Sequence, residues 1–315
     1  APLHAARVVA SFDGARAEVF KVPTGERYKT REMWQHLTDD LLRNGFGRDS
    51  AVIALGGGVI GDLAGFVAAT FMRGIPYVQV PTTLLAMIDA SIGGKTAVDT
   101  PAGKNLVGAF HRPAAVVIDP GALATLPTAH LRAGLAEAIK HGVVADAEYF
   151  EHISAGLEGL LARASPEALE RLIVRSVEIK TDVVREDERE SGKRKILNFG
   201  HTLGHAIEAM SGYELLHGEA VGAGMALEAR LAERIGVAEA GTARRISDVL
   251  HRAGLPTERP SEVSAEAIIL ATRTDKKARQ GSVEYALPQR IGEMSARASG
   301  WTMAVEDRAV LEILS

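Results

Sequence analysis

A short glycine-rich segment constrains the fold of this chain more than any other feature. The apolar run at residues 51–55 ends in Gly56-Gly57-Gly58, and an apolar stretch of helical length follows at residues 59–72. A short buried strand, a tight glycine turn and a helix form the repeating unit of parallel α/β sheets. Two further apolar runs, at residues 77–80 and 114–119, predict two more buried strands. The first third of the chain is therefore expected to be an α/β domain.

After about residue 120 the pattern changes from short apolar runs to long amphipathic stretches. Stretches with apolar residues on one helical face predict helices. They lie at residues 128–142, 166–187, 199–210, 218–235 and 240–253. A late pair of β-like segments, near residues 282–287 and 296–305, predicts a small hairpin. We therefore expect two domains, an α/β domain at residues 1–120 and a mostly α-helical domain at residues 121–315.

The composition excludes several classes of protein. The chain is 46% hydrophobic and 24% charged, which is typical of a soluble globular protein rather than a disordered one. Its formal net charge of −4 gives no broad basic field of the kind that non-specific nucleic-acid binders use. The absence of cysteine excludes disulfides, thiolate metal sites and cysteine nucleophiles.

No secretory signal pattern is visible at the beginning of the sequence. The longest stretch without an acidic residue, residues 63–88, is interrupted by Arg73, Pro76, Gln79 and Pro81, so it is predicted not to span a membrane. We expect a cytoplasmic protein with no membrane partner and no nucleic-acid partner.

The segment from Gly56 to Gly61 satisfies the pattern G-x-G-x-x-G, directly after a predicted strand and at the start of a predicted helix. Glycines allow the backbone to approach a pyrophosphate, whose charge meets unpaired N–H groups at a helix N-terminus. The pattern favours nucleotide binding by a Rossmann-like domain, although a tight turn with no ligand would satisfy it too. Ordinary dinucleotide-binding domains carry an acidic residue roughly 20 positions later, and none lies between Asp62 and Asp89. An ordinary Rossmann dehydrogenase is thereby excluded.

Two glycine turns that carry lysines follow, at Gly93-Gly94-Lys95 and Gly103-Lys104-Asn105. The triplet Gly94-Lys95-Thr96 looks like the end of a P-loop, but the first glycine of that motif would fall at Asp89, which excludes an NTPase. Two lysines, an amide and backbone N–H groups can grip an anionic small molecule. A solvated surface loop is the alternative, and the pattern alone is compatible with both.

His201, His205 and Glu208 share one face of a predicted helix, at positions i, i+4 and i+7, and His217 follows after a short loop. Two or three such histidines and a carboxylate from elsewhere can hold zinc in tetrahedral geometry with one open position. Capping or surface histidines are the alternative. The H-E-x-x-H motif is absent, which argues against a zincin protease. Spacing alone does not identify the carboxylate ligand.

Taken together, the motifs resemble those of the 3-dehydroquinate synthase family of sugar phosphate cyclases, from about residue 20 onward. No single motif would suffice, but their order and spacing are specific. The motifs that carry the resemblance are Ala54-Leu55-Gly56-Gly57-Gly58-Val59-Ile60-Gly61-Asp62, Val80-Pro81-Thr82-Thr83-Leu84-Leu85-Ala86, Gly93-Gly94-Lys95, Gly103-Lys104-Asn105, Gly134-Leu135-Ala136-Glu137-Ala138-Ile139-Lys140, Asp187-Glu188-Arg189-Glu190, Asn198-Phe199-Gly200-His201-Thr202-Leu203-Gly204-His205 and His217-Gly218-Glu219.

The resemblance implies a dehydroquinate synthase-like fold with bound NAD and zinc, and cobalt would fit the same ligands. It implies that 3-deoxy-D-arabino-heptulosonate 7-phosphate is converted to 3-dehydroquinate and phosphate, a lyase step of the shikimate route to aromatic amino acids. NAD would oxidise a secondary alcohol, phosphate would be eliminated, the ketone would be reduced again and an aldol addition would close the ring.

The resemblance also implies roles for individual residues. The metal ligands would be Glu137, His201 and His217, with His205 outside the ligand set. The residues in contact with NAD would be Glu26, Lys29, Gly57, Gly58, Val59, Asp62, Thr82, Thr83 and Lys104. The residues that bind substrate would be Arg73, Asp89, Lys95, Asn105, Lys140, Lys180, Arg194, Asn198, His205 and Lys276. The catalytic residues would be Glu190 and His205, which match the family's proton-transfer positions, with Lys95, Arg194 and Asn198.

Arg73 matches an arginine that reaches a neighbouring subunit in the family, which implies a homodimer. Family members also carry a strand pair and an Asp-x-Asn turn ahead of the region present here. We expect the natural protein to carry them as well.

Four alternatives differ in substrate or chemistry. An aminodehydroquinate synthase would share nearly every motif, whereas a valiolone-type cyclase would lose groups that bind a substrate carboxylate. Lys180, Arg194 and Asn198 therefore favour a carboxylate-bearing substrate. A metal-dependent polyol dehydrogenase of similar fold would not need the anion-binding residues. A non-catalytic NAD- or phosphate-binding protein would not be expected to keep every catalytic position filled.

Overall fold

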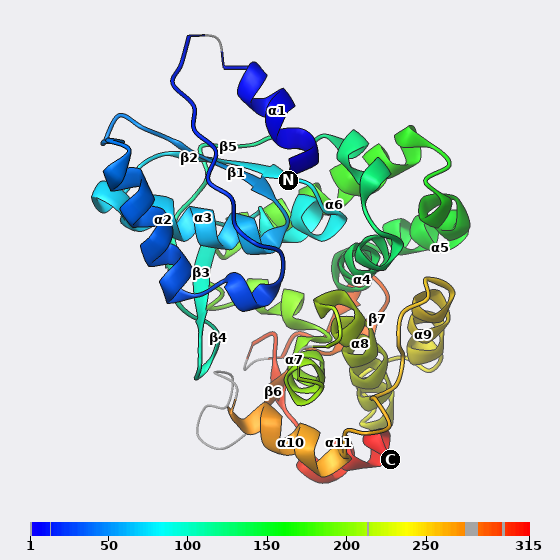
Figure 1. Cartoon of the computed structure of the whole chain (residues 1–315). Helices are drawn as coiled ribbons and strands as arrows, with labels where there is room; N and C mark the ends of the chain where they lie inside the picture. The colour runs from blue at the N-terminus through cyan, green and yellow to red at the C-terminus, as the bar shows by residue number, and fades with distance from the viewer. Residues whose placement is uncertain (1, 13, 213, 275–282, 298–299) are drawn as a thin grey trace. The chain divides into compact units, whose positions relative to one another are not determined.

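A computed structural model of the chain defines residues 2–12, 14–212, 214–274, 283–297 and 300–315. By its internal contacts the chain divides into two compact units, Ala1–Leu126 and Pro127–Ser315. Figure 1 shows the helices and strands of both, coloured along the chain. Among the helices in the defined ranges, none is long and apolar enough to cross a membrane.

The first unit alternates helices with short strands. Its helical segments are α1 (Pro2–Ala10), η1 (Glu26–Tyr28), α2 (Arg31–Arg43), α3 (Gly58–Thr70), η2 (Phe71–Arg73), η3 (Ala86–Ala90) and η4 (Pro120–Thr125). Its strands are β1 (Val52–Gly56), β2 (Tyr77–Pro81), β3 (Lys95–Thr100), β4 (Gly103–Phe110) and β5 (Ala115–Val116). The predictions of strands at residues 51–55 and 77–80 are confirmed to within one residue at each end.

The strands β1, β2 and β5 form a parallel sheet in that order. The prediction of a buried strand at residues 114–119 is wrong in length and in burial. Only β5 forms there, with Ala115 exposed and Val116 partly buried, because it pairs with β2 alone at the edge of the sheet. The Asp119 carboxylate then accepts a hydrogen bond from the Gly121 N–H and caps η4, so the chain leaves the sheet.

The helix α3 follows β1 through the predicted glycine turn, with Gly57 as its N-cap. Two glycines let it lie directly on the strands. A Cβ atom on Gly61 would fall 2.5 Å from Gln79 of β2, and one on Gly65 would fall 2.5 Å from Thr96 of β3. The other faces of α3 contribute to two small apolar clusters, one with α2 and the sheet and one with β3 and β4. The glycine turn is thereby held at the carboxyl end of β1.

The strands β3 and β4 form an antiparallel hairpin, where the sequence predicted only two glycine turns. Both turns are present, since Gly93 and Gly94 precede β3 with positive φ and Gly103 has a φ of 147° at the hairpin tip. The strands approach closely because a Cβ atom on Gly108 would fall 2.1 Å from the carbonyl oxygen of Thr96. The two glycine turns are therefore joined by paired strands.

The second unit is mostly helical. Its helices are α4 (Thr128–Ala145), α5 (Ala147–Ala162), α6 (Pro166–Glu186), η5 (Lys193–Asn198), α7 (His201–Met210), α8 (His217–Arg234), α9 (Thr242–Arg252), α10 (Ala265–Thr274) and α11 (Asp307–Leu314). Its strands are β6 (Glu284–Tyr285), β7 (Pro288–Arg290), β8 (Glu293–Met294) and β9 (Met303–Ala304). All five predicted helices are confirmed as α4, α6, α7, α8 and α9, whereas α5, α10 and α11 were not predicted.

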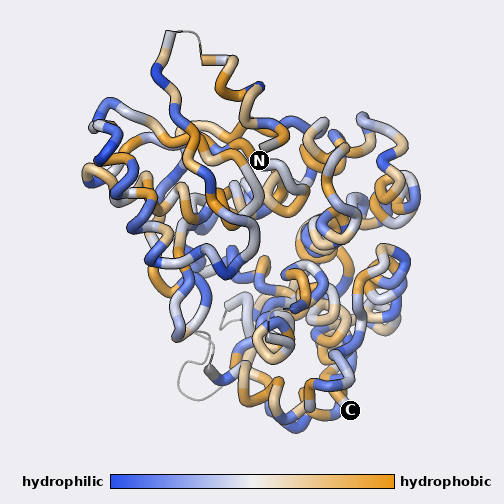
Figure 2. The backbone as a smooth tube through the Cα atoms, viewed as in Figure 1, coloured by the Kyte–Doolittle hydropathy of each residue, from blue (hydrophilic) through white to orange (hydrophobic). Residues whose placement is uncertain are grey.

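The predicted late hairpin corresponds to β6 paired antiparallel with β9, and a second pair, β7 with β8, lies between them in sequence. One apolar core of this unit is shared by α7, α8, α10, α11 and β6, and it includes Leu203, Leu227, Ile268, Tyr285 and Val310. Figure 2 shows apolar positions recurring along these helices, with hydrophilic positions between them. The core therefore holds α7 and α8 together, and these two helices carry the predicted histidines.

Candidate functional site

Three side chains of the second unit converge from three different helices. Glu137 lies on α4, His201 begins α7 and His217 begins α8. Each offers one ligand atom, and these atoms all lie within 4.8 Å of one another. The Nε2 atoms of both histidines lie 3.5 Å from the same oxygen, Oε1 of Glu137. These are the three residues expected as metal ligands.

The far sides of the two imidazole rings are held by oxygen atoms. His201 Nδ1 lies 3.1 Å from the carbonyl oxygen of Phe199, which can only accept, so Nδ1 carries the proton. His217 Nδ1 lies 3.6 Å from Oε2 of Glu208. Both rings therefore direct Nε2 toward Glu137, and two imidazole nitrogens with one carboxylate oxygen form a ligand set that suits zinc or cobalt. The residues present fit a catalytic divalent metal.

The two histidines have different electrostatic surroundings. Burial and the charge of Lys140 hold the pKa of His201 well below its usual range. Burial alone would lower the pKa of His217 too, but the carboxylates of Glu137 and Glu208 outweigh burial and raise that pKa to about 9. His201 is therefore neutral and ready to bind a cation, whereas His217 holds its proton until a cation displaces it.

Glycines explain why these three helices approach so closely. A Cβ atom on Gly218 would fall 2.1 Å from the carbonyl oxygen of Ala133 on α4. A Cβ atom on Gly224 of α8 would fall 2.0 Å from the carbonyl oxygen of Gly200, at the start of α7. No side chain separates the helices at these crossings, so the ligands that follow Ala133 and Gly200 in sequence are brought to His217 by backbone contact.

His205 and Lys140 lie beside the three ligands. The His205 ring centroid is 5.2 Å from that of His201 and 5.8 Å from that of His217. Lys140 is 2% exposed and its amino group forms an ion pair with Oε2 of Glu137. His205, Glu208 and His217 form a second set with ligand atoms within 4.8 Å of one another. Sequence reasoning placed Glu208 on the face of the histidines but gave it no role.

The segment before α7 gathers three more of the predicted residues. The Asp187 carboxylate accepts hydrogen bonds from three backbone N–H groups that follow it, including that of Arg194. Arg194 as a whole residue is 3% exposed, and its guanidinium donates to the carbonyl oxygen of Glu188 at 2.5 Å. Glu190 Oε1 accepts a hydrogen bond of 2.6 Å from Asn198 Nδ2. Glu190, Arg194 and Asn198 thus lie in one compact turn that leads into His201.

Lys180, another predicted substrate residue, lies on α6 and is 6% exposed. Its helix packs against both α4 and η5, the segments that carry Lys140 and Arg194. A buried ammonium group is costly unless anionic or dipolar groups surround it. Three buried cationic side chains on adjoining elements of one unit are therefore suited to receive an anion.

In the first unit, carboxylates surround the amino group of Lys29, which is 3% exposed. Lys29 Nζ lies 2.8 Å from Glu26 Oε1 and 3.2 Å from Asp62 Oδ2. It lies 3.6 Å from Asp99 Oδ1. Burial alone would lower the pKa of Lys29, but these carboxylates raise it above its ordinary value. Burial raises the pKa of Asp62 to about 6 despite the lysine.

The tip of the β3–β4 hairpin joins the same cluster. Asn105 Oδ1 accepts a hydrogen bond of 2.8 Å from Lys29 Nζ, and the Asn105 N–H donates to Asp99 Oδ1 at 2.9 Å. Lys104 Nζ lies 4.0 Å from Oε1 of Glu26. Four predicted NAD residues and one predicted substrate residue therefore meet in the first unit, although they are far apart in the sequence.

The glycine turn adds a second group of predicted residues at the carboxyl ends of β1 and β2. A Cβ atom on Gly57 would fall 3.2 Å from the Thr83 side chain, and one on Gly58 would fall 3.2 Å from Ala90 of η3. The Thr82 N–H donates to the carbonyl oxygen of Gly56 at 2.9 Å. The residues gathered here are Gly57, Gly58, Val59, Thr82, Thr83 and Asp89. Since Gly57 has no side chain to cap α3, the helix N-terminus can receive a phosphate group.

Three predicted substrate residues need separate mention. Arg73 is exposed at the end of η2 and has a φ of 69°, in the left-handed region. Lys95 is exposed at the start of β3. Lys276 lies outside the described residues.

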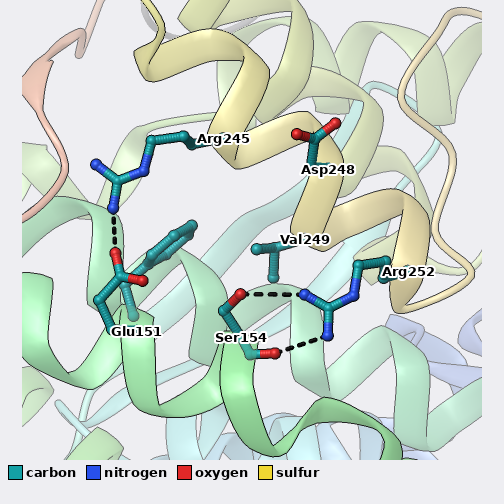
Figure 3. Close-up of a pocket in the computed structure, with 7 residues that line it drawn as sticks. Glu151, Ser154, Arg245, Asp248, Val249 and Arg252 are labelled. Atoms are coloured by element: carbon teal, nitrogen blue, oxygen red, sulfur yellow. Dashed lines mark hydrogen bonds and ion pairs between the residues drawn. The ribbon is translucent and has the colours of Figure 1, made fainter.

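A surface pocket of about 390 Å³ lies between α5 and α9 of the second unit (Figure 3). Within it, Arg245 pairs with Glu151, and Arg252 donates to the hydroxyl and carbonyl oxygens of Ser154. It contains none of the residues that the sequence singled out. The candidate site therefore lies elsewhere, around Glu137 and the histidines.

Two family profiles match successive parts of the chain. The profile described as 3-dehydroquinate synthase N-terminal matches residues 19–133, and the one described as 3-dehydroquinate synthase C-terminal matches residues 134–278. The curated 3-dehydroquinate synthase of Nostoc punctiforme is 49% identical over 290 residues, which cover 91% of this chain and 80% of that relative. The 3-dehydroquinate synthase of a Picosynechococcus species is 47% identical over 283 residues, covering 89% and 78%.

The comparison with solved structures agrees with the family profiles. The 2-epi-5-epi-valiolone synthase ValA from Streptomyces hygroscopicus, with NAD⁺ and Zn²⁺ bound, superposes with a TM-score of 0.90 at 33% identity, covering 99% of this chain and 86% of that one. A 2-deoxy-scyllo-inosose synthase complexed with carbaglucose-6-phosphate, NAD⁺ and Co²⁺ gives a TM-score of 0.87 at 28% identity, covering 94% and 82%. Both match nearly all of this chain, which confirms the predicted fold class.

Proposed function

Because this chain belongs to the 3-dehydroquinate synthase family, we propose that it is an NAD- and metal-dependent lyase acting on 3-deoxy-D-arabino-heptulosonate 7-phosphate. The products are 3-dehydroquinate and phosphate, formed by oxidation, phosphate elimination, reduction and aldol ring closure. The observation that carries the proposal is the convergence of Glu137, His201 and His217 on one point. The 49% identity to a named 3-dehydroquinate synthase supports the choice of substrate.

Residues of the second unit hold the metal and handle protons. His201 and His217 would hold it through Nε2, and Glu137 would hold it through its carboxylate. When bound, the metal supplies a Lewis acid and NAD supplies an acceptor and donor of hydride. His205 lies beside the ligands and takes up or releases protons. Asn198 Nδ2 orients the Glu190 carboxylate, the second proton-transfer group, before substrate arrives.

Cationic residues bind the anionic ends of the substrate. In the second unit these are Lys140, Lys180 and Arg194, all buried, with Asn198 as a directional donor. In the first unit Lys95 is the cationic residue, Asn105 contributes its neutral amide, and Asp89 accepts from a substrate hydroxyl. Cations held in advance align a flexible sugar phosphate and stabilise charge that develops as phosphate leaves. Lys276 is proposed as a further cationic residue that binds substrate.

The first unit binds NAD. The N-terminus of α3 at Gly57, Gly58 and Val59, where no side chain caps the helix, would receive the NAD pyrophosphate. Asp62, Glu26, Lys29 and Lys104, with Thr82 and Thr83, contact the remainder of the cofactor. The Lys29 cluster keeps Asp62 and Glu26 in place before NAD binds. We also propose a homodimer, in which Arg73 reaches the partner's phosphate site, and a cytoplasmic location.

The test follows phosphate release from 3-deoxy-D-arabino-heptulosonate 7-phosphate, with Zn²⁺ and catalytic NAD present, and records NADH absorbance in parallel. Phosphate without net NADH is expected, because the hydride returns within each turnover. Sedoheptulose 7-phosphate serves as the comparison substrate, since the ValA neighbour is a valiolone synthase. Turnover of that sugar alone would replace the proposed substrate, and NADH accumulating with a polyol would indicate a dehydrogenase.

A further inference from the structure

We propose that Glu208 is the positioning residue for the metal ligand His217, holding its ring so that Nδ1 carries a proton and Nε2 faces the metal. The inference rests on the proposed metal site of Glu137, His201 and His217. It gives a role to a buried carboxylate that the proposed reaction leaves without one.

The geometry places one carboxylate at each end of the His217 ring. Glu208 Oε2 lies 3.6 Å from Nδ1, and Glu137 Oε1 lies 3.5 Å from Nε2. Glu208 is 4% exposed and comes from α7, while His217 begins α8, so the contact joins two helices that already pack together. The ring is therefore fixed from both sides, by groups on α7 and α4.

The chemistry of the two atoms determines the tautomer. A carboxylate can only accept, so the hydrogen on the side of Glu208 must belong to His217 Nδ1. The lone pair of a neutral ring then lies on Nε2, the atom that faces Glu137. His201 reaches the same tautomer differently, through the neutral carbonyl of Phe199. An anionic partner makes His217 the stronger electron donor of the two ligands.

The charge of Glu208 also matters for binding a cation. Lys140 forms an ion pair with Glu137, and its positive charge opposes a divalent metal at the same carboxylate. Glu208 adds one negative charge on the opposite side of His217 and offsets that repulsion. Both effects predict weaker metal binding when Glu208 loses its charge.

The competing arrangement uses Glu208 as a ligand, together with His205 and His217. The two arrangements place the metal on different nitrogens of His217. With the metal on Nε2, Glu208 lies outside the coordination shell and only the affinity depends on it. With the metal on Nδ1, Glu208 is a ligand and its loss changes the coordination itself.

Co²⁺ binding to the full chain distinguishes these cases, with affinity measured by chelator competition and coordination by visible absorption. In Glu208→Gln we expect roughly 10- to 100-fold weaker binding, the usual effect of losing such a partner, with unchanged band positions. Glu219→Gln is the matched control, because Glu219 also lies near His217 but accepts from the Leu216 N–H, which glutamine can still do. Its affinity should stay within about two-fold of the unmodified chain, since no ring contact is lost.

Unchanged affinity in Glu208→Gln would overturn the inference, and so would altered band positions, which would make Glu208 a ligand. A wrong assignment of the metal site itself would give a different result. In that case His201→Ala would bind Co²⁺ with the same affinity as the unmodified chain. If the variant fails to fold by circular dichroism, the unmodified Zn²⁺-loaded protein provides the test. Its ¹⁵N-histidine spectrum must show a protonated Nδ1 for His217, and protonation at Nε2 would refute the proposal.

Discussion

The carboxylate of Glu228, in the middle of α8, accepts a hydrogen bond of 2.7 Å from the backbone N–H of Gly200, at the start of α7. Its other oxygen accepts from the Leu203 N–H at 2.9 Å. Glu228 therefore caps a helix on which it does not lie. Because Gly200 has a φ of 78° and no side chain, α7 has no capping side chain of its own at this position. The position of His201, the next residue, depends on this buried carboxylate.

Replacing Glu228 with glutamine should destabilise the protein and weaken metal binding together. The amide presents an N–H₂ group to one backbone N–H, and leaving a buried donor without an acceptor costs about 1–3 kcal/mol. Glu233→Gln is a suitable control, since Glu233 lies on the same helix and caps α9 through the Ala243 N–H. Urea denaturation and Co²⁺ titration should both show a loss in Glu228→Gln and little change in Glu233→Gln, because a glutamine oxygen can still accept from the single Ala243 N–H. Equal Co²⁺ affinities of Glu228→Gln and the unmodified chain would mean that the cap does not position His201.

His217→Ala should remove metal and activity together. The substitution deletes one of three ligands and leaves Glu137 and His201, so we expect metal affinity to fall by more than about 100-fold, beyond the range for an outer-shell partner. Metal content after dialysis and phosphate release are the measurements. His251→Ala, at an exposed position on α9, controls for loss of a histidine. Retention of both metal and turnover in His217→Ala would show that the ligand set is wrong.

Lys95→Ala should weaken substrate binding without affecting the fold. Lys95 is exposed at the start of β3, and a charge-assisted contact to an anion is worth about 1.5–3 kcal/mol, or on the order of 10- to 100-fold in kcat/KM. Steady-state kinetics on the sugar phosphate test this, with thermal unfolding as a check on the fold. Lys21→Ala, another exposed lysine of the same unit, should match the unmodified chain. Kinetic constants that stay unchanged in Lys95→Ala would remove Lys95 from the site.

The stability of the NAD-free protein should depend on pH through Asp62. Burial raises its pKa from 3.8 to about 6 in the folded state, so the folded chain binds a proton between these values that the unfolded chain releases. The contribution of Asp62 to stability therefore falls as pH rises from about 4 to about 6, by on the order of 2–3 kcal/mol, and is constant above that range. The side chain is 21% exposed, which keeps solvent screening small.

Asp62→Asn should remove this slope. Urea denaturation of both proteins at several pH values between 4 and 8 gives the difference in the free energy of unfolding, and titrations common to both cancel. A difference that does not vary with pH would show that Asp62 titrates normally.

The sequence predicted the second unit well because its helices have long apolar faces that include residues such as Leu203 and Leu227. The prediction from sequence failed where the burial of a strand depends on neighbouring strands rather than on its own apolar residues. Residues 114–119 are apolar enough for a buried strand, yet β5 has a partner on one side only and stays exposed. The β3–β4 hairpin was not predicted, and its strands approach closely at Gly108, a contact that depends on the pairing rather than on a local pattern.

The site was predictable in part. The spacing of His201 and His205 and the nearby His217 indicated a metal, but Glu137 is on another helix and came only from the family resemblance. The cluster around Lys29 could not be predicted from local patterns, because its carboxylates come from η1, α3 and β3. The role of Glu228 was missed for the same reason, since a helix cap contributed by a distant helix has no local signature.

The crossing of α7 and α8 at Gly200 and Gly224 has a practical consequence for redesign of this protein. At that crossing the spacing between His201 and His217 is fixed by main-chain atoms, which have no rotamers to change. Core side chains further along both helices, such as Ile207 and Leu231, lie in the apolar core away from the helix starts. They can be varied to raise thermal stability while the spacing of the histidines is preserved, whereas even a single methyl group at Gly224 would separate them.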